Sequence, residues 1–197
     1  MSDFIVKPLD KTTWPDFARL VEKHNGVWGG CWCMAFHEEG APGKRTVDQR
    51  RSDKENRVRE GRAHAALVYD GPNAVGWCQF GPTDELARIK LKRDYQNGLT
   101  ELPDWRITCF FVDRNYRSQG VTSVALEGAL REIAQLGGGT VESYPQDVAG
   151  QSTSGSFLYN GTVSMFERQG FRRARRLGKN HWVVTKVVRE LSKKRPK

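Results

Sequence analysis

Apolar residues recur at helical spacing soon after the N-terminus and predict an amphipathic helix over residues 14–23. Its apolar face consists of Trp14, Phe17, Ala18, Leu20 and Val21. Thr13 stands at the N-cap position, with Pro15 in the first turn and Asp16 three residues after the cap, as is typical of a helix start. The preceding stretch "FIVKPL" alternates well enough to predict a first strand.

A second and longer helical pattern covers residues 118–136. Its apolar face consists of Leu126, Ala129, Leu130 and Ile133, and three glycines end it at residues 137–139. Residues 47–62 are strongly polar and predict a helix that lies on the surface. Residues 162–170 predict a short helix.

Apolar and β-branched stretches predict the strands. "HAALVYD" and "AVGWCQFGP" flank the turn "GPN" and predict a hairpin, while "WRITCFFVD" predicts a central strand. "TVESYP" predicts another strand, and "FRRARRLG" with "HWVVTKVV" predicts a closing hairpin. The span 83–104 is less regular and is expected to contain a helical turn or two. This order of elements predicts an α/β sandwich with a mixed sheet.

The length of 197 residues suits one domain, 1–191, followed by a basic and disordered tail, 192–197. No apolar run approaches the roughly 18 residues of a membrane span, and the N-terminus lacks the charged-then-apolar order of a signal peptide. Four cysteines are too few for a disulfide scaffold. We therefore expect a reduced, cytoplasmic protein without a membrane partner.

The formal net charge of +9 favours an anionic partner of some kind, and about half of this charge lies in the tail. The best candidate for binding nucleic acid is "FRRARRLGKN", with five cations between Arg172 and Lys179. Alternation along a strand divides these cations between two faces, and no aromatic residue interleaves with them to stack on bases. A solvated hairpin is the favoured interpretation, so nucleic acid is not the expected partner.

A polar turn, "YRSQGVT", joins the central strand to the long helix and carries the strongest chemical signal of the chain. The first N–H groups of a helix have no partners within it, and with the helix dipole they form a receptor for an anion such as a pyrophosphate. Gly120 lets the backbone approach phosphate oxygens, and the guanidinium of Arg117 can pair with phosphate. On residue types alone, a turn that is only structural stays open.

Two motifs and the order of the elements resemble the GNAT superfamily of N-acetyltransferases. The family's acetyl-CoA signature is Arg or Gln, two residues, Gly, one residue, then Gly or Ala. Residues 117–122 match it except at the last position, where Thr122 replaces the small residue. The second signature is a short helix that ends in "QGF" at residues 169–171, with Asn160 near its start. The resemblance covers residues 3–188 and implies a mixed, mostly antiparallel sheet flanked by helices.

The resemblance implies acetyl-CoA as the co-substrate and transfer of its acetyl group to a primary amine by direct attack, without a metal. The strand backbone at 110–112 would receive the pantetheine arm, and the turn 117–122 the pyrophosphate. A small-molecule or peptide amine would enter from the opposite side, under the loops between the first and second strands. The implied cofactor-binding residues are Phe110, Phe111, Val112, Arg117, Ser118, Gln119, Gly120, Val121, Thr122 and Asn160.

Two alternatives remain open beside this interpretation. The same fold could serve as a CoA-binding or nucleic-acid-associated module without turnover. A homodimer is also compatible with the sequence.

The acid and base of the reaction are where this chain departs from the family it resembles. Many members carry a tyrosine, five residues before the phenylalanine of the second signature, that protonates the leaving thiolate. Phe166 holds that position here, and the central strand carries no carboxylate base. Tyr159 and Tyr144 are the candidate acids, and Glu142 is the candidate base, either directly or through a water. Alternatively, Glu142 faces solvent or pairs with an arginine.

The loop over residues 24–44 is rich in glycine yet carries large apolar side chains. Trp28, Trp32, Met34 and Phe36 form either a wall for the substrate or a set that packs on the core, and both interpretations stay open.

The cysteines suggest neither a metal nor a nucleophile. Cys31, Cys33 and His37 lack a complementary Cys/His pair elsewhere in the chain, and a zinc site usually needs four ligands. Cys109 lies in the middle of the central strand, where we expect a small core residue rather than an acyl-carrying thiol.

Overall fold

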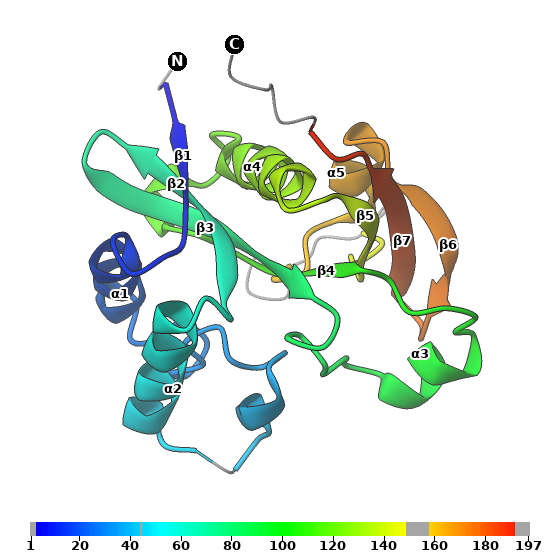
Figure 1. Cartoon of the computed structure of the whole chain (residues 1–197), viewed down its shortest axis with the longest axis horizontal. Helices are drawn as coiled ribbons and strands as arrows, with labels where there is room; N and C mark the ends of the chain where they lie inside the picture. Colours follow the sequence, from blue (N-terminus) through cyan, green and yellow to red (C-terminus); the bar gives the residue numbers. More distant parts are fainter. Residues whose placement is uncertain (1–2, 44, 149–157, 192–197) are drawn as a thin grey trace.

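A seven-stranded sheet runs through the molecule in the order β1-β2-β3-β4-β5-β7-β6 (Figure 1). The structure is a computed structural model that describes residues 3–43, 45–148 and 158–191. The strands are β1 (Ile5–Pro8), β2 (His64–Asp70), β3 (Asn73–Pro82), β4 (Trp105–Val112), β5 (Gly139–Ser143), β6 (Arg172–Leu177) and β7 (His181–Val188). The helices are α1 (Trp14–Lys23), α2 (Val47–Arg59), α3 (Lys92–Asn97), α4 (Val121–Gln135) and α5 (Val163–Arg168), with short 3-10 turns η1 (Glu38–Gly40) and η2 (Arg114–Tyr116).

Helices cover both faces of the sheet. Helices α4 and α5 lie on one face, and α1 and α2 lie on the other (Figure 1). The face under α4 carries one apolar cluster, to which Phe110 and Phe166 belong, and the face under α1 carries a second, to which Cys109 and Phe111 belong. Alternate residues of β4 therefore serve the two clusters, as the pleat of a strand requires.

Strands β4 and β5 form the one parallel pair among the described strands, and they stay together over a short distance. Their register ends with Ile107 opposite Ser143. On the other side of β4, Gln79 pairs with Cys109 and Phe80 with Ile107, so Thr108 is an extra residue that bulges from the ladder. Beyond this bulge β4 remains bonded to β3 but no longer to β5. The sheet consequently opens between the end of β4 and the end of β5.

Most of the predicted elements are confirmed. The helix over residues 14–23, both hairpins, the central strand and the short helix before β6 are present, and the irregular span contains the short helix α3. The mixed, mostly antiparallel sheet flanked by helices is also confirmed. The predicted tail, 192–197, lies outside the described residues. Within the described ranges, no helix combines the length and the apolarity that crossing a membrane demands.

One predicted helix start is confirmed and another is wrong in detail. Helix α1 begins at Trp14 with Thr13 as its N-cap residue, as predicted. The side chain of Thr13 makes no capping bond to its helix and instead donates to the carbonyl oxygen of Pro8, 2.7 Å away. The carboxylate of Asp10 accepts from the N–H groups of Thr12 and Thr13, so an Asx-type turn leads into α1. Helix α4 begins at Val121 rather than at residue 118, because the backbone of Ser118 is left-handed (φ 62°) and cannot continue a helix.

Helix α2 is not the purely surface helix that its composition predicts. It begins at Thr46 with a reciprocal capping box and ends at Arg59, three residues early. One of its faces is buried and includes Lys54 and Arg57. Their charges led to the prediction of a solvent-exposed helix. In the folded protein, however, Lys54 contacts His37 and Arg57 contacts Glu39.

Helix α4 carries a buried carboxyl group whose protonation should make the stability of the protein depend on pH. One oxygen of Glu132 is buried without a hydrogen-bond partner among the described residues. Burial raises the pKa of Glu132 from its ordinary 4.5 to about 8, against a smaller lowering by Arg131. Between about pH 4.5 and pH 8, the carboxyl group therefore keeps its proton in the folded protein but loses it in the unfolded chain. The free energy of unfolding must consequently fall as the pH rises through this window.

We expect Glu132→Gln to remove most of this fall, which in the wild type should approach about 1.4 kcal/mol per pH unit. Urea unfolding at the two ends of the window measures it. Glu127→Gln, on an exposed position of the same helix, is the control and should keep the wild-type slope. Equal slopes for wild type and Glu132→Gln would contradict the assignment.

Candidate functional site

The turn before α4 presents a row of free backbone donors. Gly120 occupies the N-cap of α4 with a left-handed backbone (φ 82°), and residues 117–120 are exposed. Within the described residues, the N–H groups from Arg117 to Thr122 have no acceptor. A Cβ built on Gly120 would have no atom within 4 Å, so the space above the turn is open. This is the geometry in which a helix N-terminus receives a phosphate.

A pocket of about 220 Å³ lies between this turn and the end of β4. It brings together the predicted cofactor residues of the strand and two of the turn. Its lining consists of Trp28, Phe110, Phe111, Val112, Arg117, Thr122 and Leu158. Thr122, at the position where the family has a small residue, therefore lines the pocket. Ser118 and Gln119 stay on its outer rim, and the side chain of Val121 is buried in the core.

The segment before α5 lies along β4 where β5 has separated from it. The N–H of Phe110 donates to the carbonyl oxygen of Tyr159, 2.7 Å away. The side-chain amide of Asn160 donates to the carbonyl oxygen of Thr108 at 2.6 Å, which satisfies the bulged residue of β4. Asn160 thus positions this segment through β4, and Tyr159 lies at the junction of the neighbouring pockets.

Two further pockets open on the α1 side of the sheet. One, of about 270 Å³, shares Trp28 with the first pocket and reaches Cys33, Phe36 and Cys109. The other, of about 240 Å³, is mainly apolar, and Phe36, Tyr144 and His181 are among the residues that line it. Tyr159 and Lys90 border both, and the ammonium of Lys90 sits 3.9 Å from the centre of the Tyr159 ring. A continuous cleft therefore leads from the turn, past Trp28, to the acceptor side.

The loop residues proposed as a substrate wall separate into two groups. Trp28 and Phe36 line the cleft, and both have their rings beside that of Tyr159. Trp32 and Met34 are buried in the core under α1, where Trp32 packs against Trp14. The described lining of the three pockets includes neither of them.

The carboxylate of Glu142 is buried behind the acceptor cleft. One of its oxygens accepts from the hydroxyl of Tyr95 at 2.8 Å and from that of Tyr144 at 3.2 Å. Neither of the two alternatives holds, because the residue is 7% exposed and forms no ion pair with an arginine in the described part of the chain. Burial raises the pKa of Tyr144 well above its usual value, so its hydroxyl keeps its proton and donates it to Glu142.

Phe166 has no proton to donate and cannot act as an acid, and the side chains packed around its ring are apolar. The ring is fully buried on the α4 side of the sheet, packed edge-on against Phe110 and Phe171. Both candidate acids, Tyr159 and Tyr144, line the cleft.

Three polar residues were missed from the sequence, and two of them, Lys90 and His181, line the acceptor side. Lys90 stood in a span without a clear pattern, and Lys54 in a helix that looked wholly exposed. His181 begins β7 and borders the cleft; burial and the nearby charge of Lys90 lower its pKa, so its ring is neutral. No local signal marks these residues, because only the packing of distant elements brings them together. The candidate metal ligands do not converge: no cluster of three or more metal-binding side chains exists in the described residues.

The chain belongs to the GNAT acetyltransferase family, since residues 18–149 match the model of the acetyltransferase (GNAT) family. This match includes the open end of β4, the phosphate-receiving turn and β5. The fold described above is therefore that of an acetyltransferase family whose co-substrate is acetyl-CoA. The identity of the acceptor does not follow from membership.

Solved acetyltransferase structures have the same fold. An acetyltransferase from Thermus thermophilus has 15% sequence identity and a TM-score of 0.51, with 93% of this chain and 96% of that chain covered. The yncA protein of Salmonella typhimurium, solved with its cofactor acetyl-CoA, has 13% identity and a TM-score of 0.53, with 96% of each chain covered.

A structure from Corynebacterium glutamicum, described as histone acetyltransferase HPA2 and related acetyltransferase, has 12% identity, a TM-score of 0.57 and coverage of 98% and 99%. A search of curated protein sequences finds no match to this chain.

Gly120 offers a direct test of the phosphate receptor. Gly120→Val should weaken acetyl-CoA binding by at least about ten-fold, because the side chain fills the space in front of the free N–H groups. Gly61→Val is the matched control: Gly61 also has a left-handed backbone and open space around its Cβ position, but lies at the end of α2. Both variants should lose similar stability from backbone strain. Titration calorimetry that finds equal affinities in the two variants would exclude the turn as the phosphate site.

Proposed function

We propose that this protein transfers an acetyl group from acetyl-CoA to a primary amine that attacks the thioester directly. The observation that carries the proposal is the continuous cleft from the free donors of residues 117–122, along the open end of β4, to the pockets beside Tyr159. One end suits a pyrophosphate and the other an acyl acceptor. The separation of β4 from β5 leaves room for a narrow arm between them.

The cofactor is held by charge and by backbone. Arg117 pairs with phosphate at the mouth of the cleft, while the N–H groups of the turn bind its oxygens. Phe110, Phe111 and Val112 line the passage for the pantetheine arm. Because phosphate contacts at an exposed turn are screened by salt, acetyl-CoA affinity should fall clearly as ionic strength rises.

The acceptor side favours an amine with an apolar or aromatic body. Trp28, Phe36 and Tyr159 supply ring faces, and the pocket beside Tyr144 has a largely apolar lining. Lys90 holds a positive charge at the border of both acceptor pockets. A polycationic acceptor would meet repulsion there, whereas a small amine or an N-terminal peptide amine without neighbouring cations would not.

Removal of the amine proton is assigned to Glu142 through Tyr144. The Tyr144 oxygen can accept a proton from the cleft while its own proton passes to the carboxylate 3.2 Å away. Tyr159 lies at the thioester end and can protonate the departing thiolate. Water can also do so, because a thiolate of ordinary pKa needs little help to leave.

An acceptor screen that follows the release of free CoA thiol tests the proposal. Amines with aromatic or aliphatic bodies should be turned over, and a polyamine should be a poor acceptor. Thiol release that is absent with every amine, while acetyl-CoA still binds, would favour the alternative of a CoA-binding module. One contact favours that alternative: the Phe110 N–H, directed toward the opening, is already bonded to Tyr159 and is not free for a thioester oxygen.

Four substitutions test the proton path. Glu142→Gln and Tyr144→Phe should each lower turnover at neutral pH by about a hundred-fold, the lower range of general-base effects, with little change in acetyl-CoA affinity. Tyr95→Phe is the control, since Tyr95 donates to the same oxygen of Glu142 but is absent from the described cleft lining. It should lower turnover much less, as should Tyr159→Phe.

The loss in Glu142→Gln should shrink as the pH rises, because the free amine then loses its proton to solvent. Wild-type turnover of Glu142→Gln at every pH would exclude the carboxylate as the base. In that case the neutral ring of His181, in the same pocket, becomes the candidate.

A further inference from the structure

Two thiols meet at the inner end of the cleft. Cys33, from the loop before α2, and Cys109, on β4, both line the pocket of about 270 Å³ behind Trp28. Both belong to the apolar cluster under α1, and Cys109 lies opposite Gln79, two residues along β3 from Trp77. The indole N–H of Trp77 donates to the sulfur of Cys33, at 3.3 Å. A hydrogen bond donated to this sulfur favours its thiolate form.

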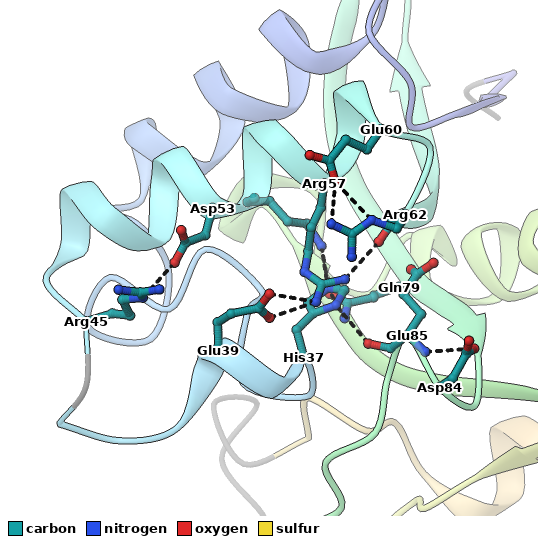
Figure 2. A network of polar contacts seen from close by, with 11 residues as sticks. His37, Glu39, Arg45, Asp53, Arg57, Glu60, Arg62, Gln79, Asp84 and Glu85 are labelled. Atoms are coloured by element: carbon teal, nitrogen blue, oxygen red, sulfur yellow. Dashed lines mark hydrogen bonds and ion pairs between the residues drawn. The ribbon is translucent and has the colours of Figure 1, made fainter.

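A buried lysine lies close enough to Cys33 for its charge to lower the pKa of that thiol. Lys54 is fully buried on α2, and its ammonium donates to the ring of His37, 3.1 Å away. The other ring nitrogen of His37 donates to the carbonyl oxygen of Glu85 at 3.1 Å, so the ring is neutral and accepts the lysine proton. His37 and Gln79 point toward this place under α2, beside the Glu39–Arg57 ion pair (Figure 2).

The charge of Lys54 needs a counter-charge. In the part of the chain that the structure describes, no carboxylate lies within ion-pair distance of its ammonium; Glu85 acts on it only from further away. A buried charge without a partner is costly. Burial lowers the pKa of Lys54 and a negative charge on Cys33 raises it, so a thiolate at Cys33 favours the charged form of the ammonium.

The two thiols consequently differ in their ionisation. Burial opposes the charge on Cys33, but the Cys109 hydrogen bond, the charge of Lys54 and the Trp77 hydrogen bond together lower its pKa. Burial and the hydrogen bond with Cys33 raise the pKa of Cys109 well above its usual value. One sulfur is prepared as a nucleophile and the other remains a thiol beside it, which is the arrangement of an attacking and a resolving cysteine.

From this geometry we infer that Cys33 and Cys109 form a reversible oxidation site that takes hydrogen peroxide and closes into a disulfide. The Cys33 sulfur attacks one oxygen of the peroxide, the O–O bond breaks, and the departing hydroxide takes up a proton to become water. The Cys109 sulfur then attacks the resulting sulfenic acid, losing its proton as the S–S bond forms and the hydroxyl leaves as a second water. The dithiol loses two electrons and the peroxide gains them; a dithiol reductant reverses the change.

The disulfide would tie the loop before α2 to β4 at the residue next to Phe110. Forming the bond draws the two free sulfur atoms to covalent distance, so the loop or the strand must shift. A shift of this size beside the thioester should lower acetyl transfer by about a hundred-fold. This consequence rests on the proposed function, whereas the formation of the disulfide does not.

Peptide mapping of the full chain under non-reducing conditions tests the site without substrate. After treatment with hydrogen peroxide, we expect a linked Cys33–Cys109 peptide that disappears with dithiothreitol. Cys78→Ser is the control, because Cys78 is buried on the other face of the sheet, and it should form the same linked peptide. Linkage of Cys33 to Cys31, or oxidation of Cys78 as fast as Cys33, would overturn the assignment.

A second experiment compares the labelling rates of the thiols in the wild-type protein and in a variant of Lys54. Cys33 should react with iodoacetamide at least about ten-fold faster than Cys78, since only the thiolate attacks. Lys54→Met should slow this labelling by a similar factor. Equal labelling rates at Cys33 and Cys78 in the wild type, or unchanged labelling in a folded Lys54→Met protein, would overturn the proposal.

A measurement of acetyl transfer distinguishes the oxidation site from the proposed function. Peroxide should inactivate acetyl transfer in wild type and Cys78→Ser reversibly, and leave the rate of Cys33→Ser, which lacks the attacking sulfur, unchanged whatever its starting value. A linked peptide in a protein without any acetyl transfer contradicts the proposed function alone. Transfer that survives complete linkage of Cys33 to Cys109 contradicts the inferred effect of the disulfide.

Discussion

The early separation of β4 from β5 is the constraint on which the rest of the site depends. A parallel pair normally continues along its ladder, but here pairing stops at Ile107 and Ser143. The backbone groups of β4 beyond that point must find other partners. Asn160 and Tyr159 supply two of them, and a bound molecule can supply others. The bulge at Thr108 keeps β4 attached to β3 while changing which side chains face each side.

The two faces of the sheet differ in chemistry, and we expect them to differ in function. The α4 face is apolar and holds β4 rigidly, with Phe110 packed on Phe166. The α1 face combines apolar rings with buried polar groups, including Glu142, Arg106 and Lys54. Glu142 and Lys54 are hydrogen-bonded there, so hydrogen bonds as well as apolar packing shape this face. Rigid positioning at one face and polar chemistry at the other suit a transfer between two bound molecules.

The fold could be predicted from the sequence to a large extent because its elements have local signals. Apolar periodicity located α1 and α4, and β-branched runs located the strands. The turn of residues 117–122 was also located from the sequence, because it stands between a strand and a helix in the order of elements that resembles the GNAT family. The burial of Trp32 and Met34, the Thr108 bulge and the pairing of Lys54 with His37 were not. Each depends on contacts between segments far apart in the chain, and Lys54 lies in a helix whose composition indicates solvent on all sides.

Helix α2 has a thermodynamic consequence of its own. Its inner face is attached by Lys54, Arg57 and the single apolar side chain of Val58. Burial of apolar surface loses strength on cooling, whereas burial of polar surface changes heat capacity in the opposite sense. The attachment of α2 should therefore persist in the cold, when the apolar clusters under α1 and α4 weaken. At high temperature α2 should be among the first elements to detach, which exposes Lys54 while the sheet remains folded. Early hydrogen exchange of the α2 amides would show this.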